Sequence, residues 1–276
     1  MRITAISILL FLNYSGLTQN ADIGLFIGGS NYSGDLTESA AISVRQTHTC
    51  FGIHGRIELD PLISMKMQYS FLAISGDDKY SQRSGNSTRK LSFESNIHEI
   101  NLSGQMQFMS LWSENTRRLN PYLQLGISIF KFNPTTQYGL ETIELQALGT
   151  EGQGLTNYPD KYSLIGIAFT MGFGLRYFLN SRYSLGVDAL VRETNTDYLD
   201  DASTNYVSYE TLLKNQGKIA ADLGNKIFAA TGTQRANPGD KDWFQSLVLT
   251  LSYHFGNNYK FDSPSLKRKQ ILCPRF

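Results

Sequence analysis

The stretch Trp243-Phe244-Gln245-Ser246-Leu247-Val248-Leu249-Thr250-Leu251-Ser252-Tyr253-His254-Phe255 carries a large apolar side chain at every second position in its second half. The apolar positions are Leu247, Leu249, Leu251, Tyr253 and Phe255. The positions between them are small or polar, with Val248 as the exception. A period of two is typical of a β-strand with one apolar and one polar face. The stretch therefore predicts a strand whose two faces meet different surroundings.

Seven further stretches repeat this alternation, and most are longer than a typical globular strand. The expected strands cover approximately residues 22–30, 50–59, 63–74, 91–109, 121–132, 162–179, 183–193 and 243–255. Single-chain bacterial outer-membrane barrels have an even number of antiparallel strands, with apolar side chains facing lipid and polar ones facing the lumen. The pattern therefore predicts an all-β fold, an eight-stranded antiparallel transmembrane β-barrel.

The connections between the expected strands alternate in length. Asp60-Pro61 and Asn180-Ser181-Arg182 form tight turns, and a modest turn lies at 110–119. Long connections are expected at 31–49, 76–90, 133–161 and 194–242. In outer-membrane barrels short turns face the periplasm and long loops face outward. We therefore expect a multi-pass outer-membrane protein with long extracellular loops and both termini in the periplasm.

The chain divides into three expected segments. Residues 1–19 are typical of a secretory signal peptide, because Arg2 precedes an apolar run and small residues follow it. The same segment could instead be a first strand or a core segment. Residues 20–256 form the barrel and residues 257–276 a short periplasmic C-terminal tail. After the N-terminal segment no apolar run is long enough for a spanning helix.

Charge and cysteine content exclude several classes of function. Lys and Arg number 25 against 24 Asp and Glu, so composition does not indicate nucleic-acid binding. The two cysteines, Cys50 and Cys273, lie on opposite sides of the membrane in this topology, so we expect them not to pair with each other. The four histidines form no recognisable metal motif, and no GxSxG is present. We expect no metal, no cofactor and no enzymatic activity.

The lumen of so small a barrel holds side chains or one small ligand rather than a channel. Its expected charged residues are Arg56, Glu58, Lys66, Glu99, Arg176, Asp188 and Arg192. Because both signs are present and an unpaired buried charge is costly, we expect these residues to pair with each other. A substrate site in the lumen is the alternative.

The long loops contain three further patterns. The run Gly149-Thr150-Glu151-Gly152-Gln153-Gly154 lacks the Lys-Ser/Thr of a phosphate loop, so we expect a tight loop that needs positive φ. The run Asp197-Tyr198-Leu199-Asp200-Asp201 could hold Ca²⁺, although solvated, capping carboxylates are the simpler interpretation. Apolar residues between 212 and 227 have helical spacing, which predicts one short amphipathic helix.

The C-terminal tail is basic. We expect it to contact a periplasmic partner, and its alternative is a disordered basic end. The candidate contact residues are Lys267, Arg268, Lys269, Cys273 and Phe276.

Several motifs of the chain resemble the PorG family of Bacteroidota. They are Gly28-Gly29-Ser30-Asn31-Tyr32-Ser33-Gly34-Asp35-Leu36, Phe132-Asn133-Pro134, Leu148 to Gly154, Thr196 to Asp201, and Cys273-Pro274-Arg275-Phe276. The resemblance covers nearly the whole chain after the signal segment, and its loop motifs are more specific than its strands.

The resemblance implies a structural subunit of the type IX protein secretion and gliding machinery. In that family the barrel is thought to tie a periplasmic ring, built by a lipoprotein and its partner, to the outer membrane. The expected partners are therefore these ring proteins and outer-membrane lipid. The alternative is a small surface barrel whose extracellular loops bind a ligand, a host factor or lipopolysaccharide.

Overall fold

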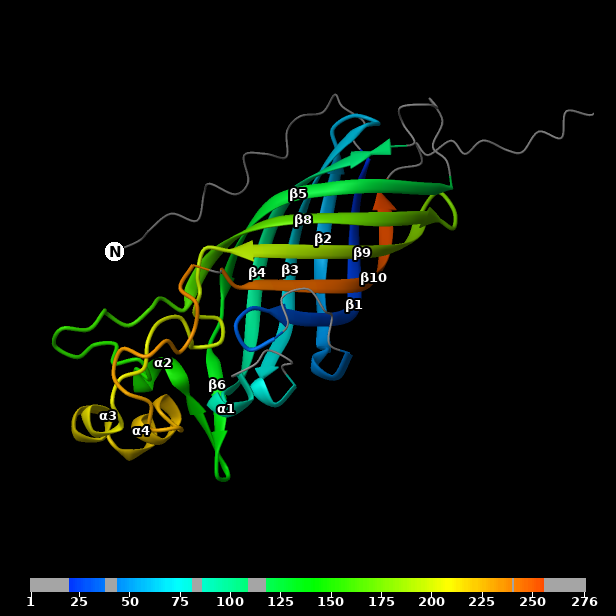
Figure 1. Ribbon diagram of the computed structural model, residues 1–276. Helices are drawn as coiled ribbons and strands as arrows, with labels where there is room; N and C mark the ends of the chain where they lie inside the picture. The colour runs from blue at the N-terminus through cyan, green and yellow to red at the C-terminus, as the bar shows by residue number, and fades with distance from the viewer. Residues whose placement is uncertain (1–19, 38–43, 81–85, 109–117, 240, 256–276) are drawn as a thin grey trace, which may run out of the picture.

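The computed structural model describes residues 20–37, 44–80, 86–108, 118–239 and 241–255. Eight long strands form its main body (Figure 1). They are β1 (Ala21–Ser33), β2 (His48–Glu58), β3 (Ile63–Asp77), β4 (Ser92–Gln107), β5 (Leu119–Lys131), β8 (Ile165–Phe178), β9 (Tyr183–Thr194) and β10 (Trp243–Phe255). The eight strands expected from the alternating pattern are confirmed, with ends that differ by a few residues.

The strands close into a barrel. Each strand pairs antiparallel with its neighbour along the chain, β5 pairs with β8, and β1 pairs with β10 to complete the cylinder. The closing register joins Ala21 to Phe255 and Ser33 to Trp243. Closure leaves no unpaired sheet edge in the wall, which a structure surrounded by hydrocarbon requires.

The two faces of the wall differ as the sequence predicts. Exposed and buried residues alternate along the whole of β4, and the exposed positions of the barrel strands are mostly apolar. Leu25 and Leu249 are each 63% exposed, and Ile127 is 61% exposed. The buried positions are rich in charged and amide side chains. An apolar exterior around a polar interior identifies an outer-membrane β-barrel. The described helices are all too short or too polar to cross a bilayer.

The long connections build an ordered cap over one end of the barrel (Figure 1). We use "cap" for residues 132–164 and 195–242. It contains a hairpin of β6 (Pro134–Tyr138) and β7 (Glu141–Glu144), followed by α2 (Leu145–Leu148), α3 (Tyr209–Gln216) and α4 (Lys218–Gly224). Short elements η2 (Val44–Gln46), η3 (Asp78–Tyr80) and α1 (Asn86–Arg89) lie in the other long connections.

Two expectations for the cap need correction. The connection at 133–161 is not a plain loop, because β6 extends the sheet by pairing with β4 and β7 pairs with β6. The single expected helix is two helices. Gly217 separates them with a φ of 92°, where its N–H donates to the Leu212 carbonyl. A left-handed residue cannot continue an α-helix, so the chain turns there.

An apolar cluster fills the junction between barrel and cap. Phe130 packs against Phe132 and Phe244, with ring centroids 5.7 and 5.5 Å apart. Phe93 meets Tyr32 edge-on at 4.9 Å. This cluster gives the cap a hydrophobic base, so the cap and the barrel mouth share one core.

Candidate functional site in the sealed lumen and its cap

The lumen contains a layer of charged residues at the end opposite the cap. Asp22 lies at its centre and accepts a hydrogen bond from Nε of Arg56 at 2.6 Å. The imidazoles of His54 and His254 each lie 3.4 Å from an oxygen of Asp22. Arg56 also lies 3.6 Å from the Glu58 carboxylate. Asp22 was not among the charged lumen residues expected from the sequence. Those residues include four cations and three acids, so a further acid facing the lumen was to be expected.

A second layer lies in the middle of the lumen. Lys66 Nζ is 3.1 Å from the Asp188 carboxylate, which also accepts a hydrogen bond from the Tyr122 hydroxyl. The Arg176 guanidinium lies 4.7 Å from the Tyr122 ring centroid and donates to the Gln105 amide oxygen at 3.1 Å. Arg176 therefore stacks and bonds to neutral groups, and the expectation of an ion pair for it is not met among the described residues.

The third layer lies nearest the cap. Arg192 makes a two-pronged contact with Glu99, with Nε to Oε1 and Nη2 to Oε2 both at 2.9 Å. Its third nitrogen donates to Ser246 at 2.6 Å. Oε1 of Glu99 also accepts a hydrogen bond from the Ser128 hydroxyl at 2.6 Å. Glu99 is 0% and Arg192 1% exposed, so this pair is removed from solvent.

The charged side chains of the three layers are almost all buried, and the apolar cluster lies above them. Mutual pairing of the lumen charges is therefore confirmed for Arg56, Lys66 and Arg192. Separating a buried ion pair leaves an uncompensated charge in a low-dielectric interior, which costs free energy. The paired side chains are therefore held in position. We call this arrangement of paired side chains the plug.

One constellation in the lumen has the connectivity of a hydrolase triad. His254 contacts Ser184 through Nε2 at 2.8 Å and Asp22 through Nδ1 at 3.4 Å. Asp22 is already neutralised by Arg56, and Ser184 is 1% exposed. A nucleophilic serine has to meet its acyl substrate beside oxyanion donors. Ser184 meets packed side chains instead, so we assign these groups to the plug.

The cap is held together by a buried ion-pair network. Arg235 contacts Glu151 at 2.8 Å, and Glu151 also accepts hydrogen bonds from Ser203 and Thr204. These contacts join the 132–164 and 195–242 segments. Asp201 accepts hydrogen bonds from Thr150 at 2.5 Å and Tyr162 at 2.8 Å. Burial raises the pKa of Asp201 to about 6, and the Arg235 guanidinium opposes that rise.

A second network fastens the cap to the barrel. The Tyr32 hydroxyl, at the end of β1, lies 2.7 Å from both the Asp200 and the Asp242 carboxyls. One hydroxyl proton cannot serve two carboxylates, so one carboxyl has to carry a proton and donate to the tyrosine oxygen. Burial raises the pKa of both Asp200 and Asp242 well above the ordinary range, in agreement with this sharing.

Of the expectations for two loop motifs, one is confirmed and one is wrong. Gly149, Gly152 and Gly154 have φ angles of 64°, 81° and 85°, so the tight loop with positive φ is confirmed. The interpretation of the 197–201 carboxylates as solvated is wrong, because Asp197 is 5% and Asp201 0% exposed. They are structural groups inside the cap. Among the described residues no cluster of three acids, histidines or cysteines is arranged to hold a metal.

The structure describes only some of the remaining residues that the sequence singled out, which are the tail residues and the two cysteines. The tail residues Lys267, Arg268, Lys269, Cys273 and Phe276 lie outside the described residues. Cys50 is buried in β2 near the capped end and forms no disulfide within the described part of the chain. Its proposed lack of pairing with Cys273 stays a prediction.

Comparison with solved structures finds other small barrels. Neisserial surface protein A gives a TM-score of 0.43 at 9% identity over 85% of this chain and 97% of that one. The attachment invasion locus protein Ail of Yersinia pestis gives 0.41 at 8% identity, covering 87% and 100%. The outer membrane protein OprG of Pseudomonas aeruginosa gives 0.42 at 11%, covering 86% and 95%.

Comparison with curated protein sequences gives no match. A family model does match, over residues 1–263, which includes the barrel and the whole cap. The chain therefore belongs to the family described as a domain of unknown function, DUF6089.

Proposed function

We propose that this protein is a structural outer-membrane subunit of the type IX protein secretion and gliding machinery. In this role the barrel anchors a periplasmic ring, formed by a lipoprotein and its partner, to the outer membrane. The barrel catalyses no reaction, and its lipid-facing wall anchors it in the outer membrane. The cap faces outward, and the short turns and the C-terminal tail face the ring.

The observation that carries the proposal is the position of the motifs that resemble the PorG family. Four of the five motifs lie within the described residues, far apart in sequence, and all four lie at the capped end, where the first and the third bond to the fourth. Tyr32 of the first motif bonds to Asp200 of the fourth, and Thr150 of the third bonds to Asp201 of the fourth. Asn133 of the second donates its N–H to Ser95 on β4. Within the described residues, the resemblance therefore concerns one end of the barrel rather than scattered short matches.

The plugged lumen supports the same role. A component that conducts or transports needs a path, whereas paired and buried charges cross the described lumen at three levels. A rigid cylinder that is anchored in lipid and closed inside suits an attachment point.

The test is removal of the tail. A variant truncated after Phe261 is expected to fold, as judged by heat-modifiable migration on gels, and to lose co-purification with the ring lipoprotein. A matched control replaces Lys267, Arg268 and Lys269 by Gln in the full-length chain and separates charge from length. If the truncated barrel still brings down the ring proteins, the tail is not the contact, and the short turns at 59–62 and 179–182 are to be tested next. If the unmodified barrel itself does not bring down the ring proteins, the anchoring role is wrong.

Orientation is tested separately. A cysteine introduced at Glu141, at the tip of the β6–β7 hairpin, is expected to react with a membrane-impermeant maleimide on intact cells in a Cys273→Ser background. A cysteine at Ser181, in the short turn between β8 and β9, is expected to react only after the outer membrane is opened. The reverse pattern would refute the outward-facing cap.

One observation favours the alternative, a cap that binds an external ligand. Phe228 is 72% exposed and holds a φ of 53°, which is unusual for a bulky residue. Asn225 fixes this loop by donating to the Val207 and Ala229 carbonyls and accepting from Ala229. Residues with strained backbone conformations are frequent at binding sites. Phe228→Ala is expected to leave ring co-purification unchanged, and to reduce surface binding if this alternative holds.

A further inference from the structure

The eight barrel strands have one outward-facing Lys or Arg among their described residues. The Lys and Arg residues of the eight barrel strands are Arg56, Lys66, Lys131, Arg176 and Arg192. Four of these are buried in the lumen, and only Lys131 faces outward. Its side chain has no ion-pair partner among the residues that the structure describes. An unpaired ammonium on a lipid-facing wall calls for an anion from the surroundings.

The position of Lys131 relative to the apolar band is fixed by register. Lys131 lies directly across from His98, and the next outward pair toward the barrel centre is Ile129 and Ile100. Ile129 is 59% and Ile100 52% exposed. Side chains directly opposite on paired strands have Cβ atoms roughly 5 Å apart, so Lys131 and His98 reach the same small group. The pair stands at the polar edge of the lipid-facing surface, on the capped side.

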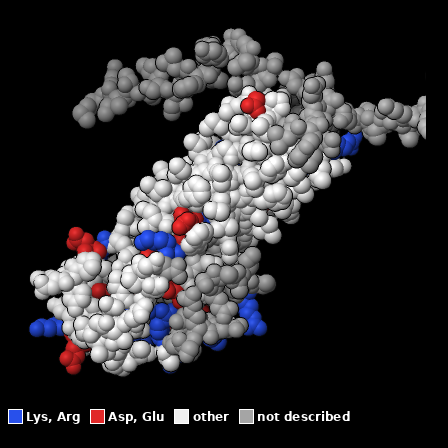
Figure 2. Space-filling view, turned by 45° about the horizontal axis from the view of Figure 1, so that its top comes forward, with Lys and Arg blue, Asp and Glu red and all other residues white. Residues whose placement is uncertain are grey.

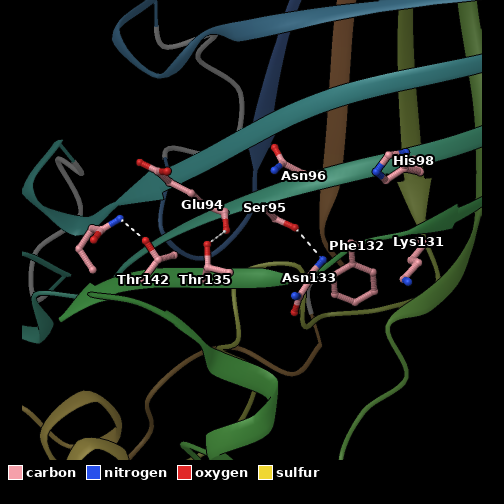
Figure 3. A pocket seen from close by; sticks show the side chains of 10 residues that line it. Glu94, Ser95, Asn96, His98, Lys131, Phe132, Asn133, Thr135 and Thr142 are labelled. Carbon is pink, nitrogen blue, oxygen red and sulfur yellow. Dashed lines mark hydrogen bonds between the residues drawn. The ribbon is translucent and has the colours of Figure 1, made fainter. Parts of the chain in front are cut away.

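A cleft of about 430 Å³ opens beside this pair. Figure 3 shows Lys131 and His98 at one end of the cleft, with Glu94 and Thr142 toward the other. The strand β4 forms one wall and the β6–β7 hairpin supplies the other. On the face seen in Figure 2, charged side chains gather over the capped end, and most of the barrel wall is uncharged. The cleft therefore joins the apolar wall to the polar cap.

The lining has donors at one end and an acceptor at the other. The Tyr69 hydroxyl lies 2.9 Å from His98 Nδ1, so when it donates there Nε2 carries a proton that can be donated onward. Lys131 adds three N–H donors on a flexible stem. At the far end the Glu94 carboxylate makes no ion pair within the described chain, and it can accept from hydroxyl groups. The order suits a ligand with a phosphate near the hydrocarbon boundary and sugar hydroxyls above it.

We propose that this cleft binds the phosphorylated sugar headgroup of an outer-leaflet glycolipid, with the phosphate on Lys131 and His98. The acyl chains of the same lipid would lie along Ile129 and Ile100. The inference rests on the part of the proposed function that places the cap outside, because only then does the cleft face the outer leaflet. It does not depend on the ring partner.

The test measures lipid binding to the purified full-length protein. Diphosphoryl lipid A is titrated into the protein in detergent, and bound lipid is counted by native mass spectrometry. Lys131→Gln is expected to weaken binding at least tenfold. Lys131→Arg, which keeps the charge and donors, is expected to stay within threefold of the parent. Lys214→Gln removes the same charge from an exposed position on α3, and is expected to change nothing.

Two further probes identify what the cleft recognises. Lipid A stripped of both phosphates is expected to bind the parent protein as weakly as diphosphoryl lipid A binds Lys131→Gln. Inorganic phosphate alone is expected not to compete at equal concentration. Equal binding of diphosphoryl lipid A to the parent and to Lys131→Gln would overturn the site. Full competition by inorganic phosphate would overturn the lipid as its ligand.

This outcome is separate from that of the proposed function. Lys131→Gln is expected to co-purify with the ring proteins like the parent, because the cleft lies at the capped end and the tail contact at the other. Loss of lipid A binding with retained ring contact supports both proposals. Retained lipid A binding in Lys131→Gln refutes only the headgroup site.

Discussion

Substitution of Glu99 by alanine tests whether the folded barrel depends on compensation of the buried Arg192 charge. Glu99 accepts three hydrogen bonds, two from Arg192 and one from Ser128. After the substitution Ser128 keeps a partner, because Thr170 lies 2.8 Å from its hydroxyl. Arg192 loses both contacts of its charged fork and keeps only Ser246. The perturbation therefore leaves a buried guanidinium with its charge uncompensated.

The magnitude follows from those lost contacts. A hydrogen bond to a charged group is worth roughly 1.5–3 kcal/mol, and two such bonds disappear. Breaking a buried ion pair by removing one partner costs roughly 3–5 kcal/mol in comparable cases. We expect Glu99→Ala to lower the free energy of unfolding by about 4 kcal/mol. The stacking of Arg192 over Phe244, at 5.3 Å, offsets only a small part of this loss.

The assay is equilibrium unfolding by guanidinium in phospholipid vesicles, followed by tryptophan fluorescence. Glu193→Ala is the matched control, because Glu193 lies on β9 next to Arg192 but faces outward and is exposed. It is expected to change stability by no more than about 0.5 kcal/mol. The double variant Glu99→Met with Arg192→Met removes both charges and is expected to recover most of the loss. A cost below about 1 kcal/mol for Glu99→Ala would refute the view that the buried charge of Arg192 depends on Glu99 for compensation.

Three further predictions concern the cap. Tyr32→Phe removes the hydroxyl shared by Asp200 and Asp242, and should weaken the attachment of the cap by about 2 kcal/mol, seen as faster hydrogen exchange at 199–206. The raised pKa values of the same two carboxyls mean that the folded cap holds protons which the unfolded chain releases above about pH 4. Stability is therefore fully present at low pH and lost as pH rises through the folded pKa, so corrected exchange protection of the cap should be greater at pH 5 than at pH 8. Equal protection at both values would contradict this linkage. Gly149→Ala and Gly139→Ala both place a side chain at φ near 65°, but a Cβ at Gly149 meets Gln153 O at 2.6 Å, whereas at Gly139 it meets nothing within 4 Å. Limited proteolysis of the cap should therefore be faster for Gly149→Ala, by an amount equivalent to at least 1 kcal/mol, and equal rates would show that the loop relaxes freely.

Most of the barrel follows from local sequence. Lipid on one side and packed polar groups on the other impose a period of two, and each strand carries that pattern without help from its neighbours. The lengths of the connections then set which strands pair, so strand number, order and closure could all be predicted. The positive φ of Gly149 was also predictable, because a glycine-rich run between polar residues has few other uses.

The polar contacts of the interior were predictable only as a class. Ion pairing in the lumen follows from the cost of an unpaired buried charge, but the choice of partner depends on register across the barrel. Lys66 and Asp188 lie 122 positions apart and meet only because the cylinder closes. Asp22 was missed for the same reason, since nothing near it in sequence shows that Arg56, His54 and His254 converge on it.

The sequence by itself determined the membrane-facing wall, because every strand has one face in direct contact with lipid and carries apolar residues there. Only the tertiary structure decided the cap, where Asp197, Asp200 and Asp201 looked like solvated loop residues and became its buried core. Tyr32 and Asp242 are separated by 210 positions, so their contact exists only after both ends of the barrel strands have been brought together. A polar loop sequence does not reveal such contacts, since burial of a polar group depends on partners that the closed barrel alone supplies.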